Sequence, residues 1–185
     1  MTIEYETQFK LSDDLKNVKN RLREICCNIS DRRVTGELEG GLLIALGDYF
    51  QGVPAARQLG INSLQDRLLT VFQDDFQETL ESLMRPDSTY HDGAIIVDRT
   101  GQVLGASVYL EVEHPNREID EGCSTRHLAA NSYSMRPETI RTYTVSEETG
   151  KVRIYFSGER IELYDPVAEK DKEQAEKIIT TKKKK

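Results

Sequence analysis

The chain has 185 residues, of which 37% are hydrophobic and 31% are charged, and its formal net charge is −7. This length and composition predict one globular domain with a buried core, and no apolar run approaches the roughly 18 residues of a membrane-spanning helix. The acidic balance argues against nucleic acid and anionic membranes as partners, because both select basic surfaces.

The N-terminus and the cysteines indicate a cytoplasmic protein. The first residues lack the basic stretch followed by an apolar stretch that is typical of a secretory signal. Cys26 and Cys27 are adjacent and Cys123 is distant, which fits neither a disulfide framework nor a metal site, so we expect reduced thiols. The lysines at 182–185 are typical of a solvated tail, with anion binding as the alternative.

The first half of the chain predicts two long helices around a buried strand. From a cap at Ser12, apolar residues recur at three- and four-residue steps, which predicts an amphipathic helix. Its stripe consists of Leu15, Val18, Leu22, Ile25 and Ile29. A turn at 36–41 precedes an apolar run at 42–46, which we expect to be a buried strand. A second helix is expected from residue 62 or 63 to near Arg85. Its apolar side consists of Leu64, Leu68, Val71, Phe72, Phe76 and Leu80.

The second half of the chain predicts two β-hairpins with a short helix between them. The four strands cover residues 94–97, 103–110, 140–145 and 152–156. A helix over 126–135 has Ser124 and Thr125 as candidate caps. Together these elements predict an α/β (α+β) fold, in which helices flank a mixed central β-sheet and an amphipathic helix leads the chain.

Three polar segments interrupt this pattern, and the first is STYHDGA at residues 88–94. It places His91 and Asp92 directly before a glycine and a buried strand, where a carboxylate would stand beside exposed backbone. Gly93 would permit close approach of a ligand because it has no Cβ. An ordinary Asp-Gly turn is the alternative interpretation.

The second segment is CSTRHLAA at residues 123–130, which gathers hydroxyls, a guanidinium and an imidazole at a helix start. Free backbone N–H groups and the helix dipole suit phosphate oxygens at such a position. Arg126 adds a donor that can bind phosphate through two hydrogen bonds. A capped helix with surface arginine and histidine is the alternative.

The third segment is VSEETG at residues 145–150, a hairpin turn with two adjacent carboxylates. One of them could help to hold a divalent cation, although a solvated acidic turn is the alternative. As a set, the three segments supply phosphate donors, oxygen ligands for a metal and a carboxylate for an attacking hydroxyl. These are the requirements of phosphoryl transfer.

The order and separation of these segments resemble the catalytic domain of the diadenylate cyclase family. Residues 91–94 resemble its Asp-Gly-Ala motif, which is often preceded by His. Residues 124–129 resemble its Gly-Thr-Arg-His-Arg-Ala motif, and residues 145–150 resemble its Ser-Glu-Glu-Thr-Gly segment. The likeness extends over about residues 20–160 and implies a soluble branch of the family.

The resemblance implies a metal-dependent enzyme that joins two ATP molecules into cyclic di-AMP and releases two pyrophosphates. The reaction is expected at the face-to-face interface of two protomers, in a homodimer or higher homo-oligomer. Residues 36–165 would be the catalytic domain, with a helical extension at 1–35 and a charged tail at 166–185. We expect the apolar stripe of the first helix to pack on its own domain, with a contact between protomers as the alternative.

The resemblance also assigns roles to residues. Asp92 would lie near the ribose hydroxyl and promote its attack, while His91 and Glu148 would hold Mn²⁺ or Mg²⁺. Tyr109 and Leu110 match a Tyr-Leu pair of the family that would sandwich the adenine. The expected nucleotide-binding residues are Gly93, Ala94, Tyr109, Leu110, Thr125, Arg126, His127, Ser146 and Glu147.

Two positions depart from the family pattern. Leu128 stands where the family has its second arginine, and Ser124 replaces a glycine. Losing one charge-assisted hydrogen bond costs about 1.5–3 kcal/mol, which impairs catalysis more readily than it abolishes it. Arg117, Arg136 and Arg141 are candidate substitutes. A weakened member that binds ATP or cyclic di-AMP as a regulatory or sensor protein is the alternative function, and an interaction protein that uses its helical face is a third.

Overall fold

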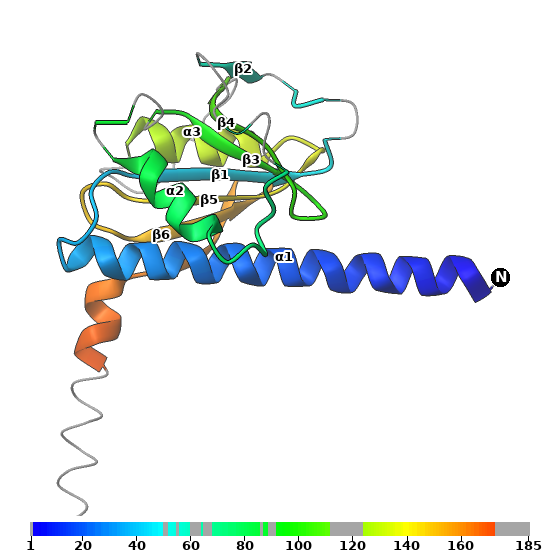
Figure 1. Ribbon diagram of the computed structural model, residues 1–185, viewed down its shortest axis with the longest axis horizontal. Helices are drawn as coiled ribbons and strands as arrows, with labels where there is room; N and C mark the ends of the chain where they lie inside the picture. The colour runs from blue at the N-terminus through cyan, green and yellow to red at the C-terminus, as the bar shows by residue number, and fades with distance from the viewer. Residues whose placement is uncertain are drawn as a thin grey trace, which may run out of the picture.

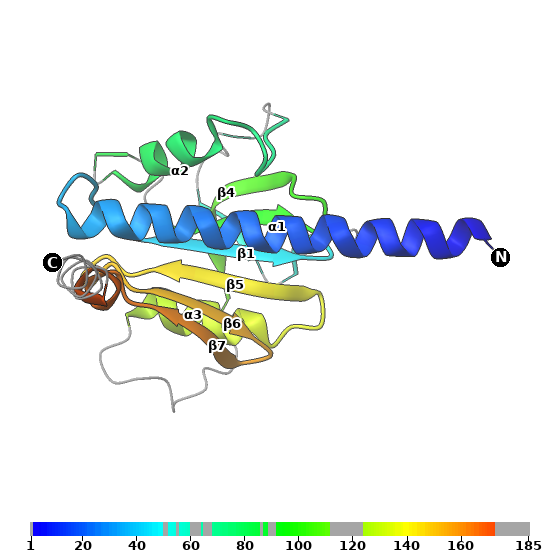
Figure 2. The ribbon, with the colours of Figure 1, turned by 90° about the horizontal axis from the view of Figure 1, so that it is seen from below.

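The structure is a computed structural model, and it positions one mixed β-sheet between helices on both faces (Figures 1 and 2). The predicted fold class is therefore confirmed. The residues that the structure describes are 2–49, 52–54, 56–59, 64, 68–85, 87–88, 92–111 and 124–172, with the side chains of 2–12 excepted.

The sheet has seven strands in the order β2-β4-β3-β1-β5-β6-β7. Their bounds are β1 (Leu42–Gly47), β2 (Ala56–Gln58), β3 (Ala94–Asp98), β4 (Val103–Leu110), β5 (Thr139–Val145), β6 (Val152–Phe156) and β7 (Glu159–Tyr164). β1 and β3 run parallel, and the other five neighbouring pairs are antiparallel. Side chains alternate along β1, so that Ile44 faces one core and Leu43 and Ala45 face the other.

Both predicted hairpins are confirmed. The β3–β4 turn closes on the Asp98 carboxylate, which accepts hydrogen bonds from the backbone N–H groups of Thr100 at 2.8 Å and Gln102 at 3.0 Å. The β5–β6 turn closes through Ser146, whose backbone N–H donates to the Lys151 carbonyl at 3.0 Å. Local turn chemistry thus sets the register of both hairpins.

Helix α1 (Thr2–Val34) lies across one face of the sheet, with α2 (Phe76–Met84) beside it, and α3 (Thr125–Ser134) covers the opposite face (Figure 2). The stripe of α1 packs into the core of its own domain, as expected, and its members from Val18 to Ile29 are fully buried. The predicted start at Ser12 was wrong. The helix begins ten residues earlier because residues 2–34 contain neither proline nor glycine to stop it.

The second predicted helix is much shorter than expected. α2 ends before Arg85 as predicted, but residues 68–75 are not helical, and residues 62–63 lie outside the described part of the chain. The backbone N–H of Val71 donates to the Gly101 carbonyl at 2.9 Å, and that of Val103 donates to Leu69. These bonds tie the segment to the β3–β4 turn. Leu68, which the pattern placed on the apolar side, is 82% exposed.

Strands β2 and β7 were not predicted. β2 has three residues and pairs with β4 at one edge of the sheet, while β7 pairs with β6 at the other edge. The side chains of β7 are exposed or half-buried throughout, so no buried period-two pattern marks it in the sequence.

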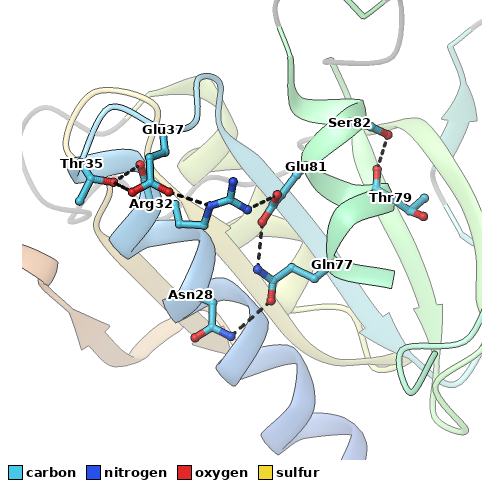
Figure 3. Close-up of polar contacts among 8 residues, drawn as sticks. All are labelled: Asn28, Arg32, Thr35, Glu37, Gln77, Thr79, Glu81 and Ser82. Carbon is cyan, nitrogen blue, oxygen red and sulfur yellow. Dashed lines mark hydrogen bonds and ion pairs between the residues drawn. The ribbon is translucent and has the colours of Figure 1, made fainter. Parts of the chain in front are cut away.

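A polar network holds α2 against α1 (Figure 3). Arg32 of α1 pairs with Glu81 of α2, which also accepts a hydrogen bond from Gln77 at 2.9 Å. Gln77 in turn accepts from Asn28 of α1 at 3.3 Å. Because Glu81 is only 8% exposed, its partners offset the cost of burying its charge.

Within the described part of the chain, no helix combines the length and apolar character that crossing a membrane requires.

Candidate functional site

A pocket of about 470 Å³ opens where the start of α3 meets the loop before β3 and the end of β4. It therefore joins two of the polar segments that the sequence singled out. Its described lining consists of Leu43, Leu59, Asp92, Gly93, Val108, Tyr109, Leu110, Ser124, Thr125, Arg126 and Ala129.

Gly93 shapes the loop that carries Asp92. Its φ is +98°, and a Cβ there would lie 2.7 Å from the carbonyl carbon of Ser107 in β4. Any other residue would collide with that strand, so the close approach that Gly93 permits is to the protein's own backbone. Ser107 itself has a φ of +55°, which marks an irregularity in β4 beside the pocket. Asp92, next to this contact, is exposed and lines the pocket.

One wall of the pocket is mainly apolar. Leu43 of β1 and Val108 and Leu110 of β4 contribute buried side chains to it, and Tyr109, which is 44% exposed, also lines the pocket. The guanidinium of Arg57, which is paired with Tyr109 across β2 and β4, lies 5.2 Å from the tyrosine ring centre. This stacking restrains Tyr109 and leaves an apolar surface that suits a flat base.

The polar end of the pocket is the first turn of α3, where Thr125 and Arg126 provide hydrogen-bond donors. The Arg126 side chain is 19% exposed and pairs with Glu147 at 3.6 Å. A Cβ on Gly41 would lie 2.2 Å from Arg126 Nη1, so a larger residue there would displace the guanidinium from this position. Arg126 thereby brings the third polar segment against the second.

His127 lies beneath the pocket and is only 4% exposed. Its Nδ1 is 2.9 Å from Ser124 Oγ, and its Nε2 is 3.0 Å from Nη1 of Arg153 on β6. Burial first, then the charges of Arg153 and Arg126, lower its pKa from about 6.5 to about 4. The imidazole is thus neutral at pH 7, and it is not among the described residues that line the pocket.

Other predicted site residues lie elsewhere. Ala94 is buried in the core under the pocket, and Ser146 Oγ accepts a hydrogen bond from the Thr149 N–H at 3.3 Å within its own turn. Glu148 lines a separate hollow with Arg33 and Lys151. His91 lies outside the described residues. The described residues that the pocket gathers from the predicted set are Asp92, Gly93, Tyr109, Leu110, Thr125 and Arg126.

Sequence reasoning missed contributions from Arg153, which contacts His127, from Gly41, which makes room for Arg126, and from Leu43, which lines the pocket. No local signal marks Arg153 or Gly41, because each meets the motif only through the folded sheet. Leu43 could have been found from the alternation of β1, which turns it toward α3.

The sequence that forms this pocket matches a known protein family. Residues 37–160 match the family model described as DisA bacterial checkpoint controller nucleotide-binding, or DAC. The match covers more than half of the chain. The chain belongs to the diadenylate cyclase (DAC) family.

Curated proteins support this placement. The chain is 26% identical over 145 residues to a diadenylate cyclase of Haloferax volcanii, and 33% identical over 79 residues to the diadenylate cyclase CdaS of Bacillus thuringiensis. These matches cover 78% and 43% of this chain but 51% and 38% of the relatives, so the chain spans about half or less of their length.

Solved structures have a similar fold. A hypothetical membrane spanning protein from Bacillus cereus gives a TM-score of 0.57 at 25% identity, covering 79% of this chain and 61% of the other. A double mutant of DacA from Staphylococcus aureus gives 0.56 at 22% identity, covering 86% and 94%. The second likeness concerns the fold alone.

The described lining of the pocket contains one cation, Arg126. Leu128 is half-buried on α3. Among the candidate substitutes, Arg136 stacks 5.5 Å from the Tyr133 ring at the far end of α3, and Arg141 lies on β5. Arg117 is outside the described residues. Arg153, which no motif indicated, is the guanidinium that reaches the motif from below.

The residues of the pocket fit a metal that arrives with a phosphate-bearing ligand. Among the described residues, no three histidine, cysteine or carboxylate side chains gather into a metal-binding group. Mg²⁺ is commonly held by one or two carboxylates together with substrate phosphates and water, and the exposed carboxylate of Asp92 provides one such oxygen donor.

Proposed function

We propose that this chain is a diadenylate cyclase, which joins two ATP molecules into cyclic di-AMP with release of two pyrophosphates. The observation that carries the proposal is one pocket lined from three distant stretches, namely Asp92–Gly93, Tyr109–Leu110 and Thr125–Arg126. Family membership supplies the reaction class, and the pocket supplies a surface for each part of the nucleotide.

We assign the apolar wall to the adenine and the start of α3 to the phosphates. Tyr109, held by Arg57, would stack on the base, and Thr125 and Arg126 would donate to phosphate oxygens. The backbone N–H groups of the first turn of α3 add to this end of the pocket. Glu147 would turn from Arg126 toward the nucleotide or its metal.

Asp92 is the proposed catalytic residue. It would attract the proton of the ribose 3′-hydroxyl, whose oxygen attacks the α-phosphate of the nucleotide in a partner's pocket as pyrophosphate leaves. Two such attacks close the ring, so the reaction requires two protomers face to face. The proposed partner is a second copy of this chain, in a homodimer or a larger homo-oligomer.

Bound Mn²⁺ or Mg²⁺ would neutralise phosphate charge in the transition state. Asp92 is the described residue placed to hold it, and His91 remains a proposed ligand. Glu148 is a weaker candidate than its sequence position indicated, since it faces the hollow of Arg33 and Lys151.

The test is to incubate the full chain with ATP and Mn²⁺ and to quantify cyclic di-AMP and pyrophosphate. We expect product from the unaltered chain and a loss of about 10²–10⁴-fold in Asp92→Asn, the range of general acid–base contributions. Asp74→Asn, which changes an exposed aspartate outside the pocket, should retain full activity. Equal product from Asp92→Asn would refute the assignment of this residue.

A second function is favoured by the single cation in the described lining of the pocket. With Leu128 in place of arginine, the chain could bind ATP or cyclic di-AMP as a regulatory protein without turning it over. Tight nucleotide binding with no product from the unaltered chain would select this function over the cyclase.

A further inference from the structure

Ser124 lies at the pocket, and its hydroxyl neither caps the helix nor packs in the core. It is exposed, lines the pocket and stands at the N-cap of α3 with φ −71° and ψ 167°. Within the described part of the chain, its hydroxyl makes no capping bond to the α3 backbone. The hydroxyl oxygen instead lies 2.9 Å from His127 Nδ1, within hydrogen-bond distance.

The direction of that bond follows from Arg153. A guanidinium can only donate hydrogen bonds, so His127 Nε2, 3.0 Å from Arg153 Nη1, must accept. A neutral imidazole with an accepting Nε2 carries its proton on Nδ1. His127 therefore donates to Ser124 Oγ. The opposite direction would place an Nε2–H against an Arg153 N–H, donor against donor.

The surroundings of His127 reinforce this tautomer. The ring is 4% exposed, and the charged groups that face it are Arg153 from β6 and Arg126 from α3, both cationic. A protonated ring would add a third positive charge and lose its acceptor. The ring therefore stays neutral, and the chain of donors runs from Arg153 through His127 to Ser124.

Because Ser124 Oγ accepts from below, its own hydroxyl proton is left to be donated elsewhere. The pocket is the open side of the residue. We propose that Ser124 is a further substrate-binding residue, whose hydroxyl donates to a phosphate oxygen of the bound nucleotide, and that His127 and Arg153 are positioning residues that direct it. The identity of the phosphate rests on the proposed function, whereas the direction of the hydrogen bonds does not.

The proposed role of Ser124 bears on both departures from the family pattern, Ser124 and Leu128. Ser124 in place of glycine adds a donor at the phosphate end of the pocket. Arg153 supplies a fixed cation beneath the same end, where Leu128 brings none. Ser124 directly precedes α3 and Arg153 lies on β6, and both contact the buried ring of His127.

The first arm of the test measures affinity for a non-hydrolysable ATP analogue, with adenosine as the probe that lacks phosphates. Ser124→Ala should lower the affinity for the analogue about tenfold or more, which is the effect of losing one hydrogen bond to a charged group. Adenosine binding should not change. Ser124→Thr keeps the hydroxyl and should restore most of the affinity. Ser82→Ala removes an exposed hydroxyl on α2, outside this pocket, and is the matched control. It should leave the analogue's affinity within about threefold.

The second arm tests the positioning residues. Arg153→Met should lower the affinity for the analogue. In the double variant it should add little to the loss caused by Ser124→Ala, because both changes break the same series of hydrogen bonds. Arg153→Lys keeps a donor and should restore part of the affinity. Nitrogen-15 spectra of the histidines, of which the chain has three, should show His127 protonated at Nδ1, and Arg153→Met should shift it toward Nε2. His127→Gln assigns the signal.

The outcomes separate this proposal from the function on which it rests. Unchanged analogue affinity in Ser124→Ala overturns the role of Ser124 while the cyclase assignment stands. A spectrum with the proton on Nε2 overturns the positioning chain at once. An unaltered chain that binds neither probe overturns the proposed function and the phosphate ligand together.

Discussion

The two faces of the central sheet are built from different kinds of residue. The face under α1 and α2 is a continuous apolar core made mainly of aliphatic side chains, with Phe76 and a buried tyrosine, Tyr143, and the Arg32–Glu81 pair links its two helices. The face under α3 buries tyrosines and polar side chains, among them Asn131 and Thr142, and ends in the pocket.

The difference indicates that one face mainly supplies stability and the other mainly supplies polar groups for the site. Aliphatic packing needs only shape and burial, so the α1–α2 face can supply most of the stability without specific polar geometry. The α3 face must hold directed donors, and each buried polar group there needs a partner. Thr142 Oγ1, for example, donates to the Ala130 carbonyl at 2.8 Å. Changes on the first face should alter stability, and changes on the second should alter chemistry.

The largest expected effect on stability comes from breaking the aliphatic face. Phe76→Ala removes a fully buried ring from α2 and should lower the free energy of unfolding by about 3–5 kcal/mol, measured by urea denaturation. The affinity of the folded fraction for an ATP analogue should not change. A parallel fall in that affinity would show that the two faces are not separable.

A smaller effect should appear on the α3 face as a pH dependence. Unfolded, His127 takes up a proton near pH 6.5, whereas the folded chain resists protonation until about pH 4. The free energy of unfolding should therefore fall by about 2–3 kcal/mol as the pH drops through this window. Denaturation at several pH values measures the slope, and His127→Gln should flatten it. An equal slope in that variant would mean that other groups cause it.

The smallest expected effect sharpens the chemical side of the comparison. Leu128→Arg restores the family residue on α3 and should raise the rate of cyclic di-AMP formation about tenfold, the lower end of a charge-assisted hydrogen bond. Stability should change by less than about 1 kcal/mol, since Leu128 is only half-buried. No gain in rate would indicate that a cation such as Arg153 already serves this position.

Local patterns predicted those parts of the fold that depend on neighbours along the chain. The stripe from Val18 to Ile29 and both hairpins follow from periodicity and turn chemistry. The non-helical stretch at 68–75 could not be predicted, because the Val71 N–H donates to the carbonyl of Gly101, a residue that is distant in the sequence. Its apolar spacing was compatible with a helix, but the tertiary contact prevailed.

The candidate site shows the same limit. Motifs indicated Asp92, Thr125 and Arg126, which share one pocket. The same motif implied that His127 holds phosphate, whereas the ring is buried and contacts Arg153, 26 residues away. Adjacency in the VSEETG turn likewise paired Glu147 with Glu148, although their side chains face different surroundings. Side-chain direction at a turn is a property of the fold.

The measurement that tests the central claim most directly is a crystal structure of the full chain with a non-hydrolysable ATP analogue and Mg²⁺. We predict the adenine against Tyr109, the ribose beside Asp92 and the phosphates at Ser124, Thr125 and Arg126. A nucleotide bound instead in the hollow of Arg33 and Lys151, with the α3 pocket empty, would contradict the account.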